Sequence, residues 1–261
     1  MPLLWNPKQA PVLNALDAVT RGWFPRKAQG HWIFGLPKSG TTVFAAALSE
    51  VTSSSALLDT PLLWGTAIKP LNESEMKAMV AAHPITFAPT LWKEPNATFY
   101  PEAAMAASQA NRHILLVRGP LQNIRSHMDR LGLKGDATSV DLAALHPNHR
   151  PAFLALADDP PALTLARRWR DTHNKACWNT PEVQVHTYES FMANPEAVLQ
   201  ATAQHLGLSV LHQPVRALAK QQQPPGANRN VRPEAFFGDA MCQEIERLTA
   251  DAFQHITSTG A

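Results

Sequence analysis

Short apolar runs alternate along the chain with longer segments that have the periodicity or the end signals of helices. Four of the apolar runs have the length of strands, at residues 31–36, 85–92, 113–117 and 183–187. The run at 113–117 (HILLV) has no polar alternation, which is typical of a strand buried on both faces of a parallel sheet. The four runs therefore predict the strands of a central sheet.

Helix signals lie between and after these strands. A proline can occupy the first position of the helix predicted at 120–131, which has its apolar residues on one face. Asn194 and Gly207 bound the segment 195–206 as an N-cap and a C-cap. The predicted helices cover residues 41–51, 120–131, 162–178, 195–206 and 240–256. Strands that alternate with helices predict an α/β fold, with a mostly parallel central sheet flanked by helices on both faces.

The length and composition fit one domain. A chain of 261 residues with a hydrophobic content of 45% can bury a sizeable core. We therefore expect a single domain over residues 1–261. Residues 132–161 have no sustained periodicity and many Pro, Asp, His and Gly residues, so they predict a long loop. This loop is either a lid or a surface insertion.

The charge and the cysteines exclude several classes of protein. The 23 Lys and Arg against 21 Asp and Glu leave a formal charge of +2, too balanced for a general nucleic-acid or membrane-surface binder. The opening residues lack the pattern of a signal peptide, and no apolar run approaches a membrane span. Cys177 and Cys242 fit neither a disulfide framework nor a zinc site. We expect a cytoplasmic protein without a metal, nucleic-acid or membrane partner. The oligomeric state is left open, with a homo-oligomer as one alternative.

The residues after the first predicted strand have the chemistry of an anion-binding loop. A helix that begins there offers unpaired N–H groups to an anion. Gly40 lets the backbone approach a ligand, and Lys38 supplies a mobile positive charge. Ser39, Thr41 and Thr42 add hydroxyl groups. The segment predicts a phosphate or sulfate site, with a turn that binds nothing as the alternative.

This loop differs from that of the P-loop nucleotide hydrolases. The spacing of Gly35 and Gly40 is the same, but Lys38 precedes the second glycine instead of following it. A kinase also needs an Asp after a neighbouring strand to hold magnesium, and the strand 113–117 is followed by Arg118. A P-loop nucleotide kinase or hydrolase is therefore the less favoured alternative. A protein that binds an adenine nucleotide without catalysis is a second alternative.

Residues 37–42 (Pro-Lys-Ser-Gly-Thr-Thr) resemble the 5'-phosphosulfate loop of sulfotransferases that use 3'-phosphoadenosine 5'-phosphosulfate (PAPS). A second match is the strand that ends before Arg118, followed by a proline-started helix that carries Ser126. In the family, the residues at these two positions hold the 3'-phosphate. Lys38 and Arg118 lie 80 positions apart, a separation similar to the family's. The resemblance runs from about residue 31 to 208 and implies a P-loop-like sulfotransferase fold.

The chemistry of the second match suits a phosphate. The planar guanidinium of Arg118 can donate two parallel hydrogen bonds, and Ser126 can add a third. Arg118 could equally cap a sheet edge. Arg125 is expected to be a solvated helix residue. Tyr188 matches the tyrosine of a Tyr-Glu corner that lies near the adenine in many members, or it is a tyrosine at the edge of the core.

The chain departs from the family pattern at two places. Val43 stands where cytosolic members often have a tryptophan that stacks on the adenine. A late Arg-Lys-Gly triplet that closes over the 3'-phosphate is missing, so Arg229 or Arg232 is the candidate there, with a solvated loop arginine as the alternative. These departures indicate a bacterial-type enzyme rather than an animal phenol or steroid sulfotransferase.

The general base has three candidates. Lys38 can neutralise the leaving oxygen, and Lys93 matches a family lysine, but the histidine that follows it in cytosolic members is missing. Glu94 lies nearly in its place and ranks first, His83 second and His127 third. Glu94 could instead pair with Lys93, and the histidines could be surface or core residues.

The acceptor is expected to be a small molecule or a glycan with a hydroxyl or amine group. Five aromatic residues near the predicted base line an acceptor pocket or belong to the core: Trp64, Phe87, Trp92, Phe99 and Tyr100. The loop 132–161 carries His146, His149 and Arg150, and as a lid it would screen the site from water.

Overall fold

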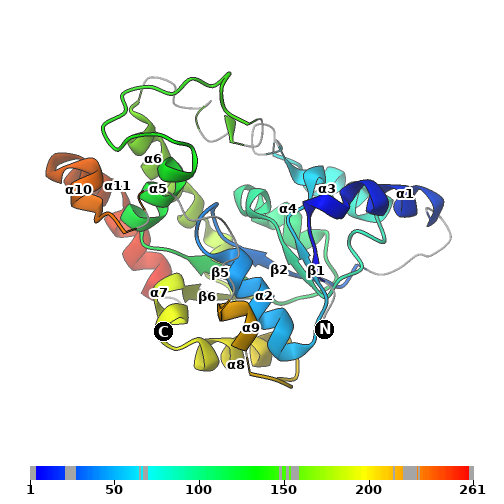
Figure 1. Ribbon diagram of the computed structural model, residues 1–261. Coiled ribbons are helices and arrows are strands. Elements are labelled where there is room, and N and C mark those ends of the chain that lie inside the picture. The colour runs from blue at the N-terminus through cyan, green and yellow to red at the C-terminus, as the bar shows by residue number, and fades with distance from the viewer. Residues whose placement is uncertain are drawn as a thin grey trace.

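The described residues form a six-stranded sheet in which all strands are parallel (Figure 1). The computed structural model describes residues 4–20, 28–64, 66, 70–146, 149–150, 153, 159–213, 215–219, 228 and 230–258. In spatial order the strands are β1 (Leu4–Trp5), β3 (Ala56–Leu58), β4 (Leu91–Lys93), β2 (His31–Phe34), β5 (His113–Val117) and β6 (Val183–Thr187). The prediction of a parallel central sheet is confirmed.

The helices that the structure describes are α1 (Ala10–Thr20), α2 (Thr41–Thr52), α3 (Glu73–Ala82), α4 (Pro101–Ala106), α5 (Pro120–Arg130), α6 (Pro161–His173), α7 (Tyr188–Ala193), α8 (Pro195–Leu206), α9 (Val215–Ala219), α10 (Pro233–Phe237) and α11 (Asp239–Ser258). Short 3-10 helices are η1 (Pro7–Gln9), η2 (Pro61–Leu63), η3 (Pro95–Phe99) and η5 (Ala176–Trp178). Within these ranges, no helix has both the length and the apolar character needed to cross a membrane.

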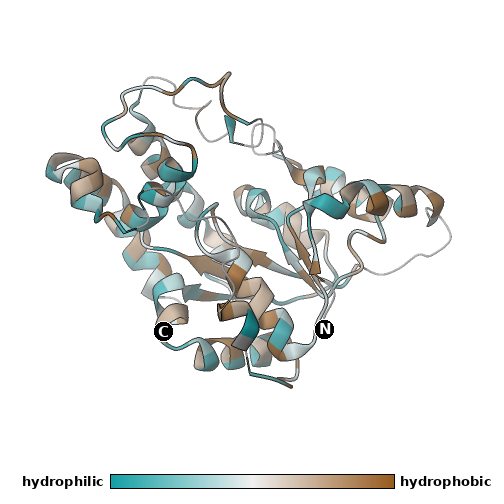
Figure 2. Cartoon of the chain, in the orientation of Figure 1, coloured by the Kyte–Doolittle hydropathy of each residue, from teal (hydrophilic) through white to brown (hydrophobic). Residues whose placement is uncertain are grey.

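Helices cover both faces of the sheet because successive strand residues point in opposite directions. Trp32 and Phe34 of β2 are buried on one face in a cluster that includes residues of α3, α4, α6 and α11. Ile33 is buried on the other face with residues of α2, α8 and α9. The strands in the middle of the sheet are accordingly brown in Figure 2. The prediction of helices on both faces is confirmed.

The strand predicted at 85–92 and the helix predicted at 162–178 have different limits. Only Leu91–Lys93 forms a strand, because Ile85 and Thr86 are held in a turn by the buried Asp17 carboxylate. Its Oδ1 accepts from the Ile85 N–H at 2.6 Å, and its Oδ2 accepts from the Thr86 hydroxyl at 2.6 Å. Helix α6 ends at His173, and η5 follows it. The strands β1 and β3 were not predicted, since each has only two or three residues.

The segment after α5 is irregular, as predicted. Residues 132–146 contain no helix or strand, and Figure 1 shows this segment arching out from the helices at the top of the molecule. It is nevertheless anchored, because Leu145 and Phe153 are buried in a third apolar cluster with residues of α5, α6, α10 and α11. Its function as a lid or an insertion stays a prediction.

A buried histidine joins β5 to β2. The Nδ1 atom of His113 accepts a hydrogen bond of 3.1 Å from the Trp32 backbone N–H, so this nitrogen carries no proton. Burial, with His31 and His205 as smaller causes, lowers the pKa of His113 to about 4. Protonation therefore favours the unfolded chain, in which a histidine has its ordinary pKa near 6.5. This contribution to stability is complete above pH 6.5 and is lost as the pH falls towards 4.

We expect the free energy of unfolding to fall by about 3 kcal/mol between pH 6.5 and pH 4 through His113 alone. The comparison variant is His113→Asn, because an asparagine oxygen can accept the same bond without titrating. Urea unfolding at several pH values should show a steeper acid loss in the wild type than in His113→Asn. Equal pH dependence in the two proteins would contradict this assignment.

Candidate active site

The predicted phosphate loop connects the end of β2 to the start of α2. Lys38 and Gly40 both have left-handed backbone conformations, with φ of 72° and 87°. For a non-glycine residue such as Lys38 this conformation costs about 1–2 kcal/mol. Gly40 is the N-cap of α2 and provides no side-chain cap, so the N–H groups of the first helical turn are not bonded by it. This is the arrangement that binds an anion at a helix N-terminus.

Neighbouring elements hold the loop in place by its oxygen atoms. Arg118 Nη1 donates to the Lys38 carbonyl at 2.9 Å. The Asn123 amide, from α5, donates to the Pro37 carbonyl and to Ser39 Oγ, both at 3.1 Å. The Ser39 N–H donates to the Leu36 carbonyl at 3.0 Å, so the N–H groups at the start of α2 are the ones that can bind a ligand. Asn123 was not predicted as a site residue, although its spacing from Pro120 and His127 puts the three on one helix face.

Tyr188 and Arg118 meet over Gly40. Val117 pairs with Thr187 in the register of β5 and β6, so the residues that follow these two strands are neighbours. The Arg118 guanidinium lies 4.8 Å from the centre of the Tyr188 ring. A Cβ atom on Gly40 would lie 2.3 Å from the same ring, which leaves room for no side chain at this position. The Gly119 N–H also donates to the Glu189 carboxylate at 3.2 Å.

Arg118 has donor capacity that its protein contacts do not use. Its Nε atom is buried and has no hydrogen-bond partner among the described residues. Burial is the largest cause that lowers the pKa of Arg118 below its ordinary value, and the group stays charged at neutral pH. A buried cationic donor without an acceptor is unfavourable, and an anionic ligand would satisfy it. Ser126 is half-buried on α5, and its hydroxyl is not involved in holding the loop.

Positive charge accumulates around Lys38. Burial first, and then the neighbouring Arg130 and Arg118, lower the pKa of the Lys38 ammonium. Each of these causes disfavours the charged form, so binding an anion here would relieve the repulsion. Among the described residues, no three His, Cys, Asp or Glu side chains lie together in a way that could hold a metal ion.

The structure gives Glu94 a different position from that expected of a base. Its side chain is 1% exposed and accepts hydrogen bonds from the Thr60 N–H at 2.8 Å and from the backbone and side chain of Asn96, both at 3.1 Å. Burial and the nearby Asp59 raise the pKa of this carboxyl. Glu94 caps η3 and joins it to Thr60, the N-cap of η2, so its oxygens are committed to the protein itself.

Lys93 and His83 are also engaged in other contacts. Lys93 is 3% exposed, and its ammonium lies 2.6 Å from the Asp59 carboxylate. Lys93 therefore forms its ion pair with Asp59, and not with Glu94 as the alternative to a catalytic Glu94 had it. His83 Nδ1 lies 3.4 Å from Asp17 on α1, at the C-terminal end of α3. The structure does not bring His83 to the loop.

Asn228, which precedes α10 in the chain, contacts α5 through Arg125, a residue that we expected to be solvated. Arg125 is only 7% exposed, and its guanidinium donates to the Asn228 carbonyl, which corrects that expectation. The Asn228 side chain and N–H in turn bind Asp129 at 3.0 and 3.1 Å. Arg232 is exposed at the N-cap of α10, and Arg229 lies outside the described residues.

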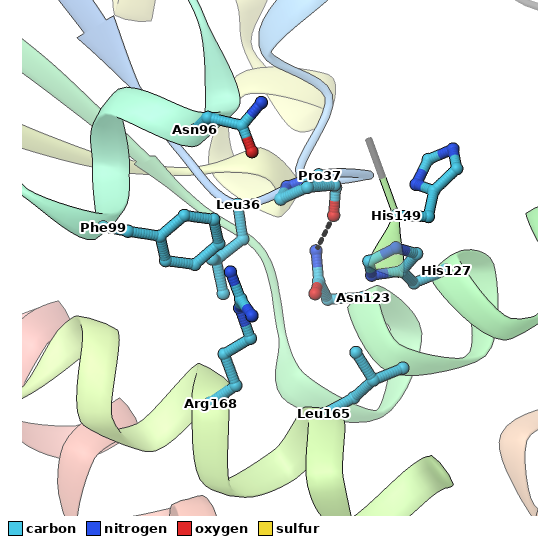
Figure 3. A pocket seen from close by; sticks show the side chains of 9 residues that line it. All are labelled: Leu36, Pro37, Asn96, Phe99, Asn123, His127, His149, Leu165 and Arg168. Carbon is cyan, nitrogen blue, oxygen red and sulfur yellow. Dashed lines mark hydrogen bonds between the residues drawn. The ribbon is translucent and has the colours of Figure 1, made fainter. Parts of the chain in front are cut away.

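A small cavity lies between the loop and helices α5 and α6 (Figure 3). Its lining residues are Leu36, Pro37, Asn96, Phe99, Asn123, His127, His149, Leu165 and Arg168. Of the five aromatic residues considered for an acceptor pocket, Phe99 lines it, with the Arg168 guanidinium 3.7 Å from its ring centre. Phe87, Trp92 and Tyr100 belong to the core, and Trp64 packs against His146. Arg168 was not predicted, because nothing in its helical pattern separates it from a surface arginine.

We expect Glu94→Gln to be milder than Glu94→Ala, because glutamine keeps one acceptor oxygen for the buried donors. Glu94→Ala removes the three hydrogen bonds that the carboxylate accepts from Thr60 and Asn96, and loss of an acceptor for a buried donor costs about 1–3 kcal/mol. Urea denaturation should therefore show a loss of several kcal/mol for Glu94→Ala and a smaller loss for Glu94→Gln. An alanine variant as stable as the wild type would refute the capping assignment.

Comparison with known proteins shows similarity in structure but no significant match in sequence. No family model matches the sequence, and no curated protein matches it significantly. The structure is similar to a sulfotransferase domain from the curacin biosynthetic pathway, with a TM-score of 0.50 and 14% identity over 89% of this chain and 98% of that one. It is also similar to sulfotransferase STF1 from Mycobacterium tuberculosis H37Rv, with a TM-score of 0.53 and 13% identity over 93% and 82%. The protein therefore has the α/β, P-loop-like fold of the sulfotransferases.

Proposed function

We propose that the protein is a sulfotransferase that uses PAPS and transfers its sulfuryl group to a hydroxyl or amine of a small-molecule or glycan acceptor. The observation that carries the proposal is the meeting of Lys38, Gly40, Arg118 and Tyr188 at one edge of the sheet. The loop offers helix N–H groups, Arg118 offers a buried cationic donor, and Tyr188 offers an aromatic ring. An adenosine bisphosphate needs these three kinds of group.

The residues of the chain fit this donor. The backbone of Ser39 to Thr42 would hold the 5'-phosphosulfate, and Arg118 with Ser126 would hold the 3'-phosphate. The orphaned Arg118 Nε is the donor that the second phosphate would satisfy. Tyr188 would lie against the adenine, and Arg229 or Arg232 would close the site from the late loop. When bound, PAPS supplies an activated sulfuryl group on a phosphate leaving group.

Lys38 has the clearest chemical task. Negative charge develops on the bridging oxygen of the leaving phosphate as the sulfuryl group departs, and a nearby ammonium stabilises it. Burial first, and then repulsion from Arg130 and Arg118, lower the pKa of Lys38, and a bound anion would offset the repulsion. Lys93, held by Asp59 at 2.6 Å, would add positive charge near Lys38.

A P-loop nucleotide kinase or hydrolase is the alternative, and the site favours it less. Such an enzyme needs a lysine after the second glycine of the loop and an Asp at the end of a neighbouring strand. Here Lys38 precedes Gly40, and Arg118 occupies the end of β5. A non-catalytic adenine-nucleotide-binding protein would share the nucleotide contacts and lack turnover.

Other expectations from the sequence stay predictions. We propose a single domain over residues 1–261 in which 132–161 is a lid or an insertion loop. We also expect a cytoplasmic location without a nucleic-acid, membrane or metal partner. A homo-oligomer remains an open alternative to a monomer.

The nucleotide site can be tested by calorimetric titration with 3'-phosphoadenosine 5'-phosphate (PAP), the desulfated product. We expect the wild type to bind PAP and to bind adenosine 5'-phosphate more weakly, because only PAP has the 3'-phosphate. Arg118→Ala should lose about tenfold to a hundredfold in affinity, since it removes a charge-assisted contact. Lys38→Ala should also weaken binding.

Matched controls are Lys77→Ala and Arg247→Ala, which remove exposed cations on α3 and α11. Both should bind PAP as the wild type does. Tighter binding of ATP with magnesium than of PAP, or an Arg118→Ala variant with unchanged affinity, would refute the proposal and favour the kinase.

A further inference from the structure

We propose that His127 is the catalytic residue that takes the proton of the acceptor, and that the acceptor's nucleophilic atom enters the cavity beside the phosphate loop. This inference rests on the proposed sulfotransferase function. It assigns the base to α5, in place of Glu94 and His83.

The cavity lies where the acceptor must approach. Leu36 and Pro37 of the phosphate loop form one wall, and Asn123 and His127 of α5 form another, as Figure 3 shows. Its volume is about 20 Å³, enough for one water-sized group. A cavity of this size can admit the hydroxyl or amine of an acceptor while the rest of the molecule stays outside.

His127 lines this cavity and has a buried nitrogen that no described residue binds. The residue is 6% exposed, and its Nε2 atom has no hydrogen-bond partner among the described residues. A buried polar atom without a partner is unfavourable, and a ligand that bonds it would remove this cost. Asn123, one turn earlier on α5, is bonded to Pro37 and Ser39, which fixes His127 relative to the loop.

The imidazole is in the protonation state that a base requires. Burial is the main cause that lowers the pKa of His127 to about 3, and His149 of the loop 132–161, Arg168 of α6 and Lys38 of the phosphate loop lower it further. The ring is therefore neutral at physiological pH and has a free electron pair. Negative charge brought to Lys38 by the donor would raise this pKa towards the range in which a base is effective.

The competing groups are less well placed. The Glu94 oxygens accept three hydrogen bonds from Thr60 and Asn96, and His83 lies against Asp17. His149 is the nearest competitor, because it lines the same cavity with its ring centre 5.8 Å from that of His127. His149 is only half-buried and lies on the irregular segment, whereas His127 lies on a helix that is bonded to the loop.

The transfer step balances as follows. The acceptor oxygen or nitrogen forms a bond to sulfur while the bond from sulfur to the bridging phosphate oxygen breaks. The electron pair of the broken bond remains on the phosphate oxygen, next to the Lys38 ammonium. The proton of the acceptor moves to Nε2 of His127, and solvent removes it after the products leave.

Hydrolysis of PAPS to PAP and sulfate tests this step without knowledge of the natural acceptor, because water fits the cavity and loses a proton in the same way. We expect His127→Gln to lower kcat by about 10²- to 10⁴-fold, the usual contribution of a general base. The KM for PAPS and the calorimetric affinity for PAP should remain within twofold. His255→Gln, on the exposed end of α11, is the control and should match the wild type.

A second variant separates chemistry from structure. His127→Ala enlarges the cavity, and added imidazole should restore its hydrolysis at least tenfold, with a pH dependence that follows free imidazole. A merely structural histidine would not respond in this way.

Each other outcome is decisive. Full activity in His127→Gln, or loss of activity in His149→Gln or Glu94→Gln alone, would overturn the assignment. PAP binding without any hydrolysis by the wild type would also overturn the cavity as the acceptor site. Failure to bind PAP at all would refute the sulfotransferase proposal itself.

Discussion

The site depends on the register of four neighbouring parallel strands. Strand β2 pairs with β4 on one side and with β5 on the other, and β5 pairs with β6. Parallel strands end at the same edge of a sheet, so the residues that follow them meet there. Lys93, the loop at Lys38, Arg118 and Tyr188 are distant in sequence, yet each directly ends or follows one of these strands. A slip of the register would separate them and turn their side chains to the opposite face.

The phosphate loop is unfavourable by itself and is stabilised from outside. Lys38 has a left-handed backbone, and its charge lies near those of Arg118 and Arg130. The hydrogen bonds from Arg118 and Asn123 to the loop oxygens offset part of this cost. The remaining repulsion and the orphaned Arg118 Nε would be relieved by an anion. The loop and Arg118 together therefore favour a ligand with two anionic groups.

The sequence predicted the parts of the site that lie directly after long strands. Loop residues 38–42 could be predicted because a strand end followed by a helix start has a recognisable local pattern. Arg118 and Tyr188 were expected from the family resemblance, and the pairing of β5 with β6 makes them neighbours. The surroundings of Glu94 and Arg125 could not be predicted. Glu94 binds the Thr60 N–H, and Arg125 binds the Asn228 carbonyl, contacts that span 34 and 103 positions of sequence. Partners so distant leave no signal in local composition.

The structure is similar to sulfotransferases with which the sequence shares only 13% and 14% identity. The fold is therefore shared although most side chains differ. The sheet, its register and the loop conformation set the fold, and many side chains can fill it. Around the cavity the chain has His127, His149 and Arg168, where the family resemblance implied a histidine after Lys93. The proposed acceptor site therefore uses these residues instead of the residues of the family pattern.

The central claim is that one edge of the sheet holds a nucleotide with two separate phosphate groups. A crystal structure of the complex with PAP tests it most directly. The account predicts the 5'-phosphate on the loop at residues 39–42, with the N–H groups at the start of α2 donating to it, and the 3'-phosphate on Arg118 and Ser126, with the adenine beside Tyr188. A nucleotide bound elsewhere, or one whose 3'-phosphate does not contact Arg118, would contradict it.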